Sequence, residues 1–457
     1  MARRPVNPPA EGWSLTLPPR LWATLSQHLF RADGGAHGAV LLAGYAEGPR
    51  GPRLLARDLI IADEGADYIP GQYGHHALAP SFVRNAVLRA RDEHSAYLAV
   101  HAHHGLDQVQ FSRIDLASHQ RGYPSLRQIS GQVVGGLVLT PHAAAGDLWL
   151  PDGSRAQLAE TVIPSGNLMR LRPSPAGEGR CDPQHDRQAR MLGDLGQETL
   201  NRLRVAVVGL GGVGSVLVEE LARLGVGELV LIDDETVDRT NLPRLIAAEP
   251  EDVGRLKTEL AVRNALRANP DVRTVPVTRR VEHPKALAEI ARCDWIFLAA
   301  DGDAARHWVN AAAQQYLIPA TQVGVKVPLT AQGEVGQIHT ATRLILPGSN
   351  CLWCCRLIDP TRLAIDMQPA AERKAADYVP GVPAPSVITL NTLAAAEALN
   401  HFVLATAGLH QDESDHASVI HRPRTRQRDL QDPRHDPDCR WCTNAGHLGR
   451  GDDRKPV

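Results

Sequence analysis

The stretch VAVVGLGGVGS (residues 205–215) decides the fold of this chain. It begins with a continuous apolar run, which predicts a strand buried on both faces, and passes directly into glycines. VLVEELARLGVG (216–227) then has the apolar spacing of a helix, and ELVLIDD (228–234) reads as a second buried strand. This order predicts a βαβ unit, and CDWIFLAADG (293–302) repeats the pattern of a buried strand ending in acidic residues. We therefore expect an α/β, doubly wound sheet that binds its ligand at the strand carboxyl ends.

The glycines after the first strand predict a nucleotide site. Gly209, Gly211 and Gly214 satisfy G-x-G-x-x-G, which permits a tight turn and lets a helix N-terminus face phosphate. Asp233 ends the next strand, where its carboxylate can accept hydrogen bonds from ribose hydroxyls. These residues alone fit a nicotinamide oxidoreductase as well as an ATP-dependent enzyme.

The residues downstream favour ATP. DDETVDRTNLPR (233–244) ends in Arg244, Lys257 follows in GRLKTE, and Asp301 lies in AADG. Attack of a carboxylate on the α-phosphate of ATP brings two anions together, so fixed cations and a metal must offset the repulsion. Arg244, Lys257 and Mg²⁺ held by Asp301 would do so, whereas hydride transfer needs no such cluster. Asp301 also fits a plainer role as the cap of the following helix.

From about His185 to about Gly408 the chain resembles the adenylation domain of the E1-like superfamily, the ubiquitin-activating enzymes and the activators of the molybdopterin and thiamine sulfur carriers. The resemblance lies in DRQARMLGDLGQETL (186–200), the glycine turn, IDDETVDRTNLPR (232–244), Lys257, ALRANPDV (265–272) and AADG. It implies an ATP-dependent adenylyltransferase acting on the C-terminal carboxylate of a ubiquitin-like or sulfur-carrier protein.

The same resemblance implies roles for individual residues. Arg187 would be an arginine finger that reaches a neighbouring protomer, which implies a homodimer. Asp301 would bind Mg²⁺. The remaining expected contacts to ATP are made by residues of the turn and of the segments after it: Gly209, Gly211, Gly212, Gly214, Asp233, Glu235, Asn241, Arg244 and Lys257.

Two pairs of cysteines predict a structural zinc site. Cys351 and Cys354 form C-L-W-C, and Cys439 and Cys442 form C-R-W-C. Four thiolates fill the tetrahedral shell of Zn²⁺ and leave no open position, so the metal would pin the polar C-terminal segment to the adenylation domain. E1-like carrier activators have zinc-binding cysteine pairs at corresponding places.

The position of an acceptor thiol remains open. Many E1-like enzymes pass the activated carboxylate to a cysteine in a crossover segment, but here that segment (359–391) contains none. Cys293 begins a buried strand and reads as core, whereas Cys181 and Cys355 are alternative nucleophiles, with Cys355 preferred. A sulfur-carrier activator without a thioester step is therefore the alternative function.

The N-terminal part carries a second candidate metal site. His101 and His103 end a predicted strand, and Asp115 follows Ser112 at a predicted helix start. Two histidines, one aspartate and an open fourth position form a catalytic zinc pattern. The segment from about 30 to 150 resembles the JAB/MPN metalloprotease fold, whose members remove ubiquitin-like tags.

The second site departs from the JAB/MPN pattern at the general base. His37 stands where that family has a glutamate, and Glu47 or Glu64 would have to substitute for it. We favour a docking or dimerisation module over a working metallopeptidase, which stays a further alternative.

Composition sets the remaining expectations. The 457 residues hold 49 Lys and Arg against 51 Asp and Glu, so the near-zero net charge of −2 argues against a general nucleic-acid binder. No apolar run approaches a membrane span and the N-terminal MARRPVNPPAEGW lacks the apolar core of a signal peptide, so we expect a cytoplasmic protein without a membrane partner. An E2-like conjugating protein is a further expected partner. The expected divisions are a JAB/MPN-like domain, 1–171; a linker, 172–184; a Rossmann-like adenylation domain, 185–415; and a tail with half of the zinc knuckle, 416–457.

Overall fold

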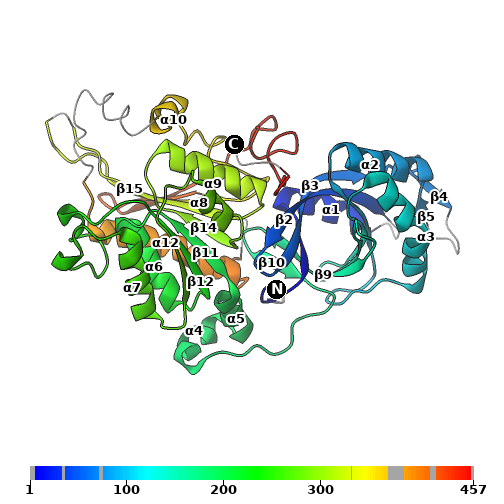
Figure 1. Ribbon diagram of the computed structural model, residues 1–457, viewed down its shortest axis with the longest axis horizontal. Coiled ribbons are helices and arrows are strands. Elements are labelled where there is room, and N and C mark those ends of the chain that lie inside the picture. Colours follow the sequence, from blue (N-terminus) through cyan, green and yellow to red (C-terminus); the bar gives the residue numbers. More distant parts are fainter. Residues whose placement is uncertain are drawn as a thin grey trace.

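The computed structural model describes residues 6–32, 37–70, 76–330, 332–368, 385–411 and 418–453. Within these residues, two eight-stranded sheets and one two-stranded ribbon organise the chain, and the two sheets lie in neighbouring bodies (Figure 1). None of the described helices is long and apolar enough to cross a bilayer.

The first sheet curls into a closed ring. Its strand order is β1-β3-β2-β6-β7-β8-β9-β10, and β1 also pairs with β9. Seven strands therefore form a closed barrel, and β10 lies outside the ring, paired only with β9 among the described strands. Helix α1 packs on one face, and α2 and α3 cover the other. The elements are β1 (Trp13–Thr16), α1 (Pro19–Leu29), β2 (Gly38–Gly48), β3 (Gly51–Ile61), β4 (Tyr68–Pro70), β5 (His76–Leu78), α2 (Pro80–Asp92), β6 (Ala96–Ala102), α3 (Arg113–Ser130), β7 (Val134–Leu139), β8 (Ala144–Trp149), β9 (Arg155–Pro164) and β10 (Leu168–Leu171).

The second sheet is Rossmann-like. Five parallel strands run in the order β13-β12-β11-β14-β15, and β16, β17 and β18 extend the sheet in antiparallel pairs. The elements are α4 (Asp186–Leu192), α5 (Asp194–Arg202), β11 (Arg204–Val208), α6 (Gly212–Arg223), β12 (Glu228–Ile232), α7 (Lys257–Ala268), β13 (Arg273–Val277), α8 (Pro284–Ile290), β14 (Trp295–Leu298), α9 (Asp303–Gln315), β15 (Ala320–Lys326), β16 (His339–Ile345), α10 (Pro360–Asp366), α12 (Ile388–Thr406), β17 (Ser418–Arg422) and β18 (Gln427–Gln431).

Burial explains the apolar runs of the second sheet. Alternate residues of β11 and β12 pack against α6, α7 and α12 on one face and against α8 and α9 on the other. A strand covered on both faces needs apolar residues throughout, which is why ELVLI is continuous rather than alternating. The predicted α/β fold with a doubly wound, Rossmann-like part is confirmed.

The first body docks on the amino-terminal edge of the second sheet. Arg50, in the turn after β2, pairs with the half-buried Asp294, whose other oxygen accepts from the backbone N–H of Arg204 at 2.9 Å. Arg53 donates to the carbonyl oxygens of Ala291 (3.0 Å) and Tyr316 (2.7 Å), which end α8 and α9. Burial opposes ionisation of Asp294, but nearby guanidinium groups outweigh it and lower its pKa. The junction is therefore a desolvated ionic contact aided by two helix C-termini.

The C-terminal segment lies in this junction. The backbone N–H of Asp452 donates to the Tyr45 carbonyl at 2.8 Å, and the Asp452 carboxylate accepts from the Glu47 N–H at 2.8 Å. The Gly449 N–H donates to the Gln314 carbonyl of α9 at 3.0 Å. Residues that read as a polar tail thus bridge β2 of the first sheet and α9 beside the second.

We predict that Gly44→Ala loosens the C-terminal segment from β2. A Cβ at Gly44 would lie 2.1 Å from the Gly449 carbonyl oxygen, so one of the two backbones must shift, at a cost of about 1–3 kcal/mol. Hydrogen exchange should rise at residues 448–453. Gly122→Ala is the control, because a Cβ there meets no atom within 4 Å. Unchanged exchange in Gly44→Ala would contradict the docked position of the segment.

Candidate functional site

The predicted nucleotide turn joins β11 to α6. Gly209 has φ +89° and an added Cβ would lie 2.5 Å from the Ala300 nitrogen, whereas a Cβ on Gly214 would lie 1.9 Å from the Gly209 carbonyl oxygen. Both positions therefore require glycine. Gly211 precedes α6, and a Cβ added there would meet no atom within 4 Å, whereas the Cβ of Gly212 would meet the Asn391 amide of α12. The turn leaves open space at a helix N-terminus.

Asp233 braces the same turn. Its two carboxylate oxygens accept hydrogen bonds from the backbone N–H groups of Leu210 (2.7 Å) and Glu235 (2.9 Å). Burial raises the pKa of Asp233, and these hydrogen bonds together with Lys257 oppose the shift. A carboxylate oxygen has a second lone pair, so the bracing role is compatible with the expected ribose contact.

Lys257 lies close to Asp233, at the first position of α7. Its side chain is buried, with 7% of the residue exposed, and its ammonium pairs with the exposed carboxylate of Glu235. The Lys257 N–H also donates to the Glu235 carbonyl at 3.0 Å. Asp233, Glu235 and Lys257 thus form one connected charged group beside the glycine turn.

Asn241 and Arg244 follow in a short loop that packs against the start of α6. The Asn241 side chain is buried, and its oxygen accepts from the Asp238 N–H at 3.2 Å. The Arg244 carbonyl lies 3.6 Å from a Cβ placed on Gly212, while its residue is half-buried. The loop therefore places the Arg244 backbone at the N-terminus of α6, and Asn241 lies three residues earlier in the same loop.

Asp301 follows β14, the strand beside β11. The sheet order changes direction between β11 and β14, and open α/β sheets bind ligands at such a switch point. Asp301 is exposed there and does not act as the helix cap, because Gly302 holds the N-cap position of α9. Arg187, on α4, is also exposed, as an arginine finger for another protomer requires.

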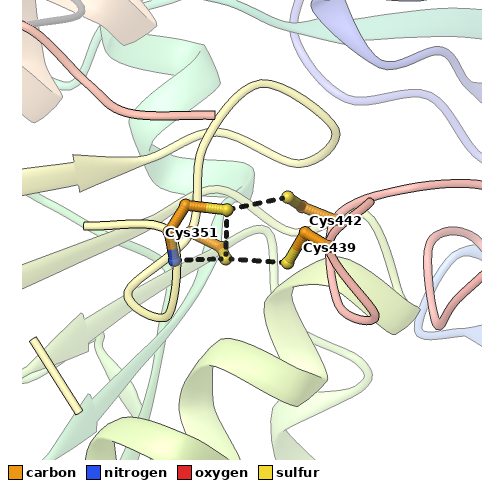
Figure 2. Close-up of side chains that lie close together, drawn as sticks. Cys351, Cys439 and Cys442 are labelled. Carbon is orange, nitrogen blue, oxygen red and sulfur yellow. Dashed lines mark hydrogen bonds between the residues drawn. The ribbon is translucent and has the colours of Figure 1, made fainter. Parts of the chain in front are cut away.

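The four predicted zinc ligands come together. The sulfur distances are 3.4 Å for Cys351–Cys354, 3.7 Å for Cys351–Cys439 and 3.6 Å for Cys354–Cys442. A tetrahedral Zn²⁺ with bonds of about 2.3 Å requires sulfurs about 3.8 Å apart, so the donor set fits the metal. Figure 2 shows thiols from the loop after β16 facing those of the C-terminal segment. Stacked Trp353 and Trp441 lie beside the cluster.

The other three cysteines differ in accessibility. Cys293 is buried, donates to the Glu289 carbonyl at 3.3 Å and has its pKa raised to about 12 by burial. Burial also raises the pKa of Cys181. Cys355 is half-buried and follows the ligand Cys354. About half of the expected crossover segment, residues 369–384 of 359–391, lies outside the described residues.

The N-terminal triad also assembles. His101 Nε2 lies 3.2 Å from His103 Nε2 and 3.6 Å from Asp115 Oδ1, and His103 Nε2 lies 3.3 Å from Asp115 Oδ2. His103 Nδ1 lies 3.0 Å from the Gln110 carbonyl, a contact that leaves Nε2 free to coordinate. Zinc–nitrogen bonds of about 2.0–2.1 Å require donor separations of about 3.3 Å in a tetrahedron, so this set also fits Zn²⁺. Asp115 additionally forms a capping box with Ser112.

Within the described residues, Asp115 is the only carboxylate grouped with His101 and His103. His37 lies against His28 of α1, with ring centroids 5.3 Å apart, on the opposite face of the sheet from α3. Glu64 pairs with Arg31 and lies 3.9 Å from His37 Nδ1.

The expectation that Glu47 substitutes as general base is wrong. Gly38 of β2 is paired with His101, and Glu47 lies nine residues farther along β2. At about 3.3 Å per residue, that separation is about 30 Å. Glu47 instead lies at the junction with the second body, beside Asp452.

The structure adds two residues that sequence patterns did not single out. Asn391 of α12 covers Gly212, and Asp366 at the end of α10 accepts hydrogen bonds from the first residues of α9. Neither belongs to a local motif, since each contacts its partner across more than 60 residues of chain.

Comparison with known proteins covers the second body. The model of the ThiF family matches residues 185–440. The "SAMP-activating enzyme E1" of Haloferax volcanii is 38% identical over 176 residues, 37% of this chain and 62% of that protein. The "Sulfur carrier protein ThiS adenylyltransferase" of Escherichia coli is 33% identical over 35% of this chain and 61% of that protein.

A longer relative matches the same kind of region. The human "Ubiquitin-like modifier-activating enzyme 7" is 32% identical over 34% of this chain and 16% of its own length. The chain thus spans about three fifths of the first two relatives and about a sixth of the third.

We predict two separable metal sites. Cys442→Ser should remove the metal of the cysteine cluster and leave the triad metal, because four thiolates are needed to close the first shell. His101→Ala should do the reverse, so each variant is the control of the other. Elemental analysis of the purified proteins, compared with the wild type, measures both. Each single variant should hold one zinc equivalent fewer than the wild type, and loss of both equivalents in either single variant would contradict two independent sites.

Proposed function

The chain belongs to the ThiF family, and from this premise we propose that it is an E1-like enzyme that uses ATP to adenylate the C-terminal carboxylate of a ubiquitin-like protein. Its relatives are named as enzymes that act on SAMP, ThiS or ubiquitin-like modifiers, and these names support this class of substrate. The alternative within the same chemistry is activation of a sulfur-carrier protein without a thioester step.

One structural observation carries the proposal. The glycine turn after β11 and the Asp301 loop after β14 meet at the switch point of the sheet, with the buried Lys257 connected to the turn through Glu235 and Asp233. A fixed cation and a free carboxylate beside an open helix N-terminus are what a magnesium-bound triphosphate requires.

The proposed chemistry is an in-line displacement. A carboxylate oxygen of the carrier attacks the α-phosphorus of ATP, a new oxygen–phosphorus bond forms, and the bond to pyrophosphate breaks. Mg²⁺ supplies charge neutralisation when it is bound, and Asp301 would hold it. Lys257 and Arg244 would offset negative charge on the phosphates, with Asn241 as a neutral donor. ATP would compete with Glu235 for the Lys257 ammonium.

The second protomer and the acceptor complete the proposal. The exposed position of Arg187 supports a homodimer in which this side chain serves the partner's site. The half-buried Cys355 is the proposed thiol for an acyl transfer ahead of an E2-like protein, because Cys293 is buried within the fold. The N-terminal triad is proposed as a zinc-binding docking module of JAB/MPN type, since no second carboxylate joins its described ligands.

We predict that Lys257→Ala lowers ATP–pyrophosphate exchange about 10²- to 10³-fold in the presence of a ubiquitin-like or sulfur-carrier protein, because transition-state charge loses a fixed cation. Lys285→Ala is the matched control, since Lys285 is exposed on α8. Wild-type protein that shows no exchange with any such carrier would contradict the proposed function.

We predict that Cys355→Ser abolishes a thiol-sensitive thioester between enzyme and carrier. The thioester is seen as a shifted band on non-reducing gels after incubation with ATP. Cys181→Ser should keep the band. A band that persists in Cys355→Ser would exclude this thiol. The absence of any band in the wild type, with exchange intact, would favour the sulfur-carrier alternative.

A further inference from the structure

Helices α9 and α10 cap each other with carboxylates. Asp366, the last residue of α10, accepts hydrogen bonds from the N–H groups of Asp303 (2.7 Å) and Ala304 (3.2 Å), the first two residues of α9. In return, the buried Asp303 carboxylate accepts from the N–H of Asp359, the N-cap of α10, at 2.9 Å. Both acids thus face the positive end of a neighbouring helix.

These hydrogen bonds between α9 and α10 fix the C-terminal side of the Asp301 loop. Asp301 is two residues before the first N–H group that Asp366 holds, and only Gly302 lies between them. Gly302 has φ +97°, and a Cβ there would lie 3.1 Å from Asp366 Oδ2. The Asp366 carboxylate is therefore packed directly against the turn that follows Asp301.

The other side of the loop is fixed by the nucleotide turn. The Ala299 N–H donates to the Val208 carbonyl at 2.8 Å, and Ala300 lies so close to Gly209 that no Cβ fits between them. Asp301 itself is exposed. The loop is thus held at two points, by the glycine turn on one side and by Asp366 on the other.

We propose that Asp366 is a positioning residue that sets the orientation of Asp301 toward a magnesium-bound nucleotide. The inference rests on the proposed function for the role of Asp301, and it adds a residue from outside the nucleotide-binding segments. Without Asp366, the N-terminus of α9 loses two charge-assisted hydrogen bonds, both accepted by Asp366 Oδ2, and the Asp301 loop keeps its anchor at Gly209. The carboxylate then reaches the metal-binding geometry in a smaller fraction of molecules.

The test is ATP binding to the full chain, measured by calorimetry with Mg²⁺ and separately with EDTA. Asp366→Ala should weaken binding with Mg²⁺ about tenfold, the effect of losing a charge-assisted contact that orders the loop. Binding without the metal should stay at the wild-type value, because the glycine turn and Lys257 are untouched. Asp366→Asn, which keeps an acceptor oxygen, should lose less.

Two further variants separate positioning from general damage. Asp359→Asn also removes one negative charge from an end of α10. The Asp359 carboxylate accepts hydrogen bonds from the N–H groups of Thr361 and Arg362 in α10 and not from α9, so this variant should leave ATP binding unchanged. If Asp366 acts through Asp301, the double variant Asp301→Asn/Asp366→Ala should bind no more weakly than Asp301→Asn alone.

The contrary results are distinct. Equal losses with and without Mg²⁺, additive losses in the double variant, or an equal loss in Asp359→Asn would each overturn the positioning role while leaving the proposed function intact. Failure of the wild type to bind ATP under either condition would overturn both.

Discussion

The close approach of Gly209 to Ala300 is the constraint on which the carboxyl edge of the second sheet depends. A side chain at residue 209 would separate the ends of β11 and β14, the two strands at the switch point. With glycine there, the turn above α6 and the loop that carries Asp301 share one small region. Asp233 then ties the turn to the segment that holds Lys257, through the N–H groups of Leu210 and Glu235. Lys257, Asp233 and the Asp301 loop therefore lie around one turn because the backbones of Gly209 and Ala300 can touch.

At the opposite edge of the same sheet, an ion pair holds the first body against the second. Asp294 precedes β14, and its ion pair with Arg50 joins the first body to the second at the strand amino ends. Burying such a pair carries a large desolvation cost, and the N–H of Arg204 offsets part of it. The C-terminal segment strengthens this junction, since it leaves the cysteine cluster, passes α9 and ends beside Tyr45 and Glu47. A metal bound to the four cysteines would fix the start of this segment and so would stabilise the contact between the two bodies.

Sequence patterns predicted those parts of the structure that depend on neighbours in the chain. The strand, glycine turn and helix follow from local spacing, and the cysteine pairs follow from ligand chemistry that tolerates any separation. Asp366 was missed because its contact with Asp303 spans 63 residues and an aspartate at a helix end has no signature. Glu47 was misjudged for a related reason: its distance from His101 depends on the register of β2 against β6, which only the paired strands reveal. Likewise, the docked C-terminal segment reads as a polar tail because its partners are backbone groups about 405 residues away.

The register of β2 also determines what the N-terminal triad can reach. His101 is paired with Gly38 at one end of this strand, and the other end lies at the junction, about 30 Å away by the rise per residue. The junction in turn lies at the amino edge of the second sheet, whereas Asp301 lies at its carboxyl edge. Helix α3, which supplies Asp115, accordingly lies at the end of the molecule farthest from α6 and α7 (Figure 1). Side chains of a few ångströms in reach do not bridge such a span, so within one protomer the triad and the glycine turn do not meet in one site.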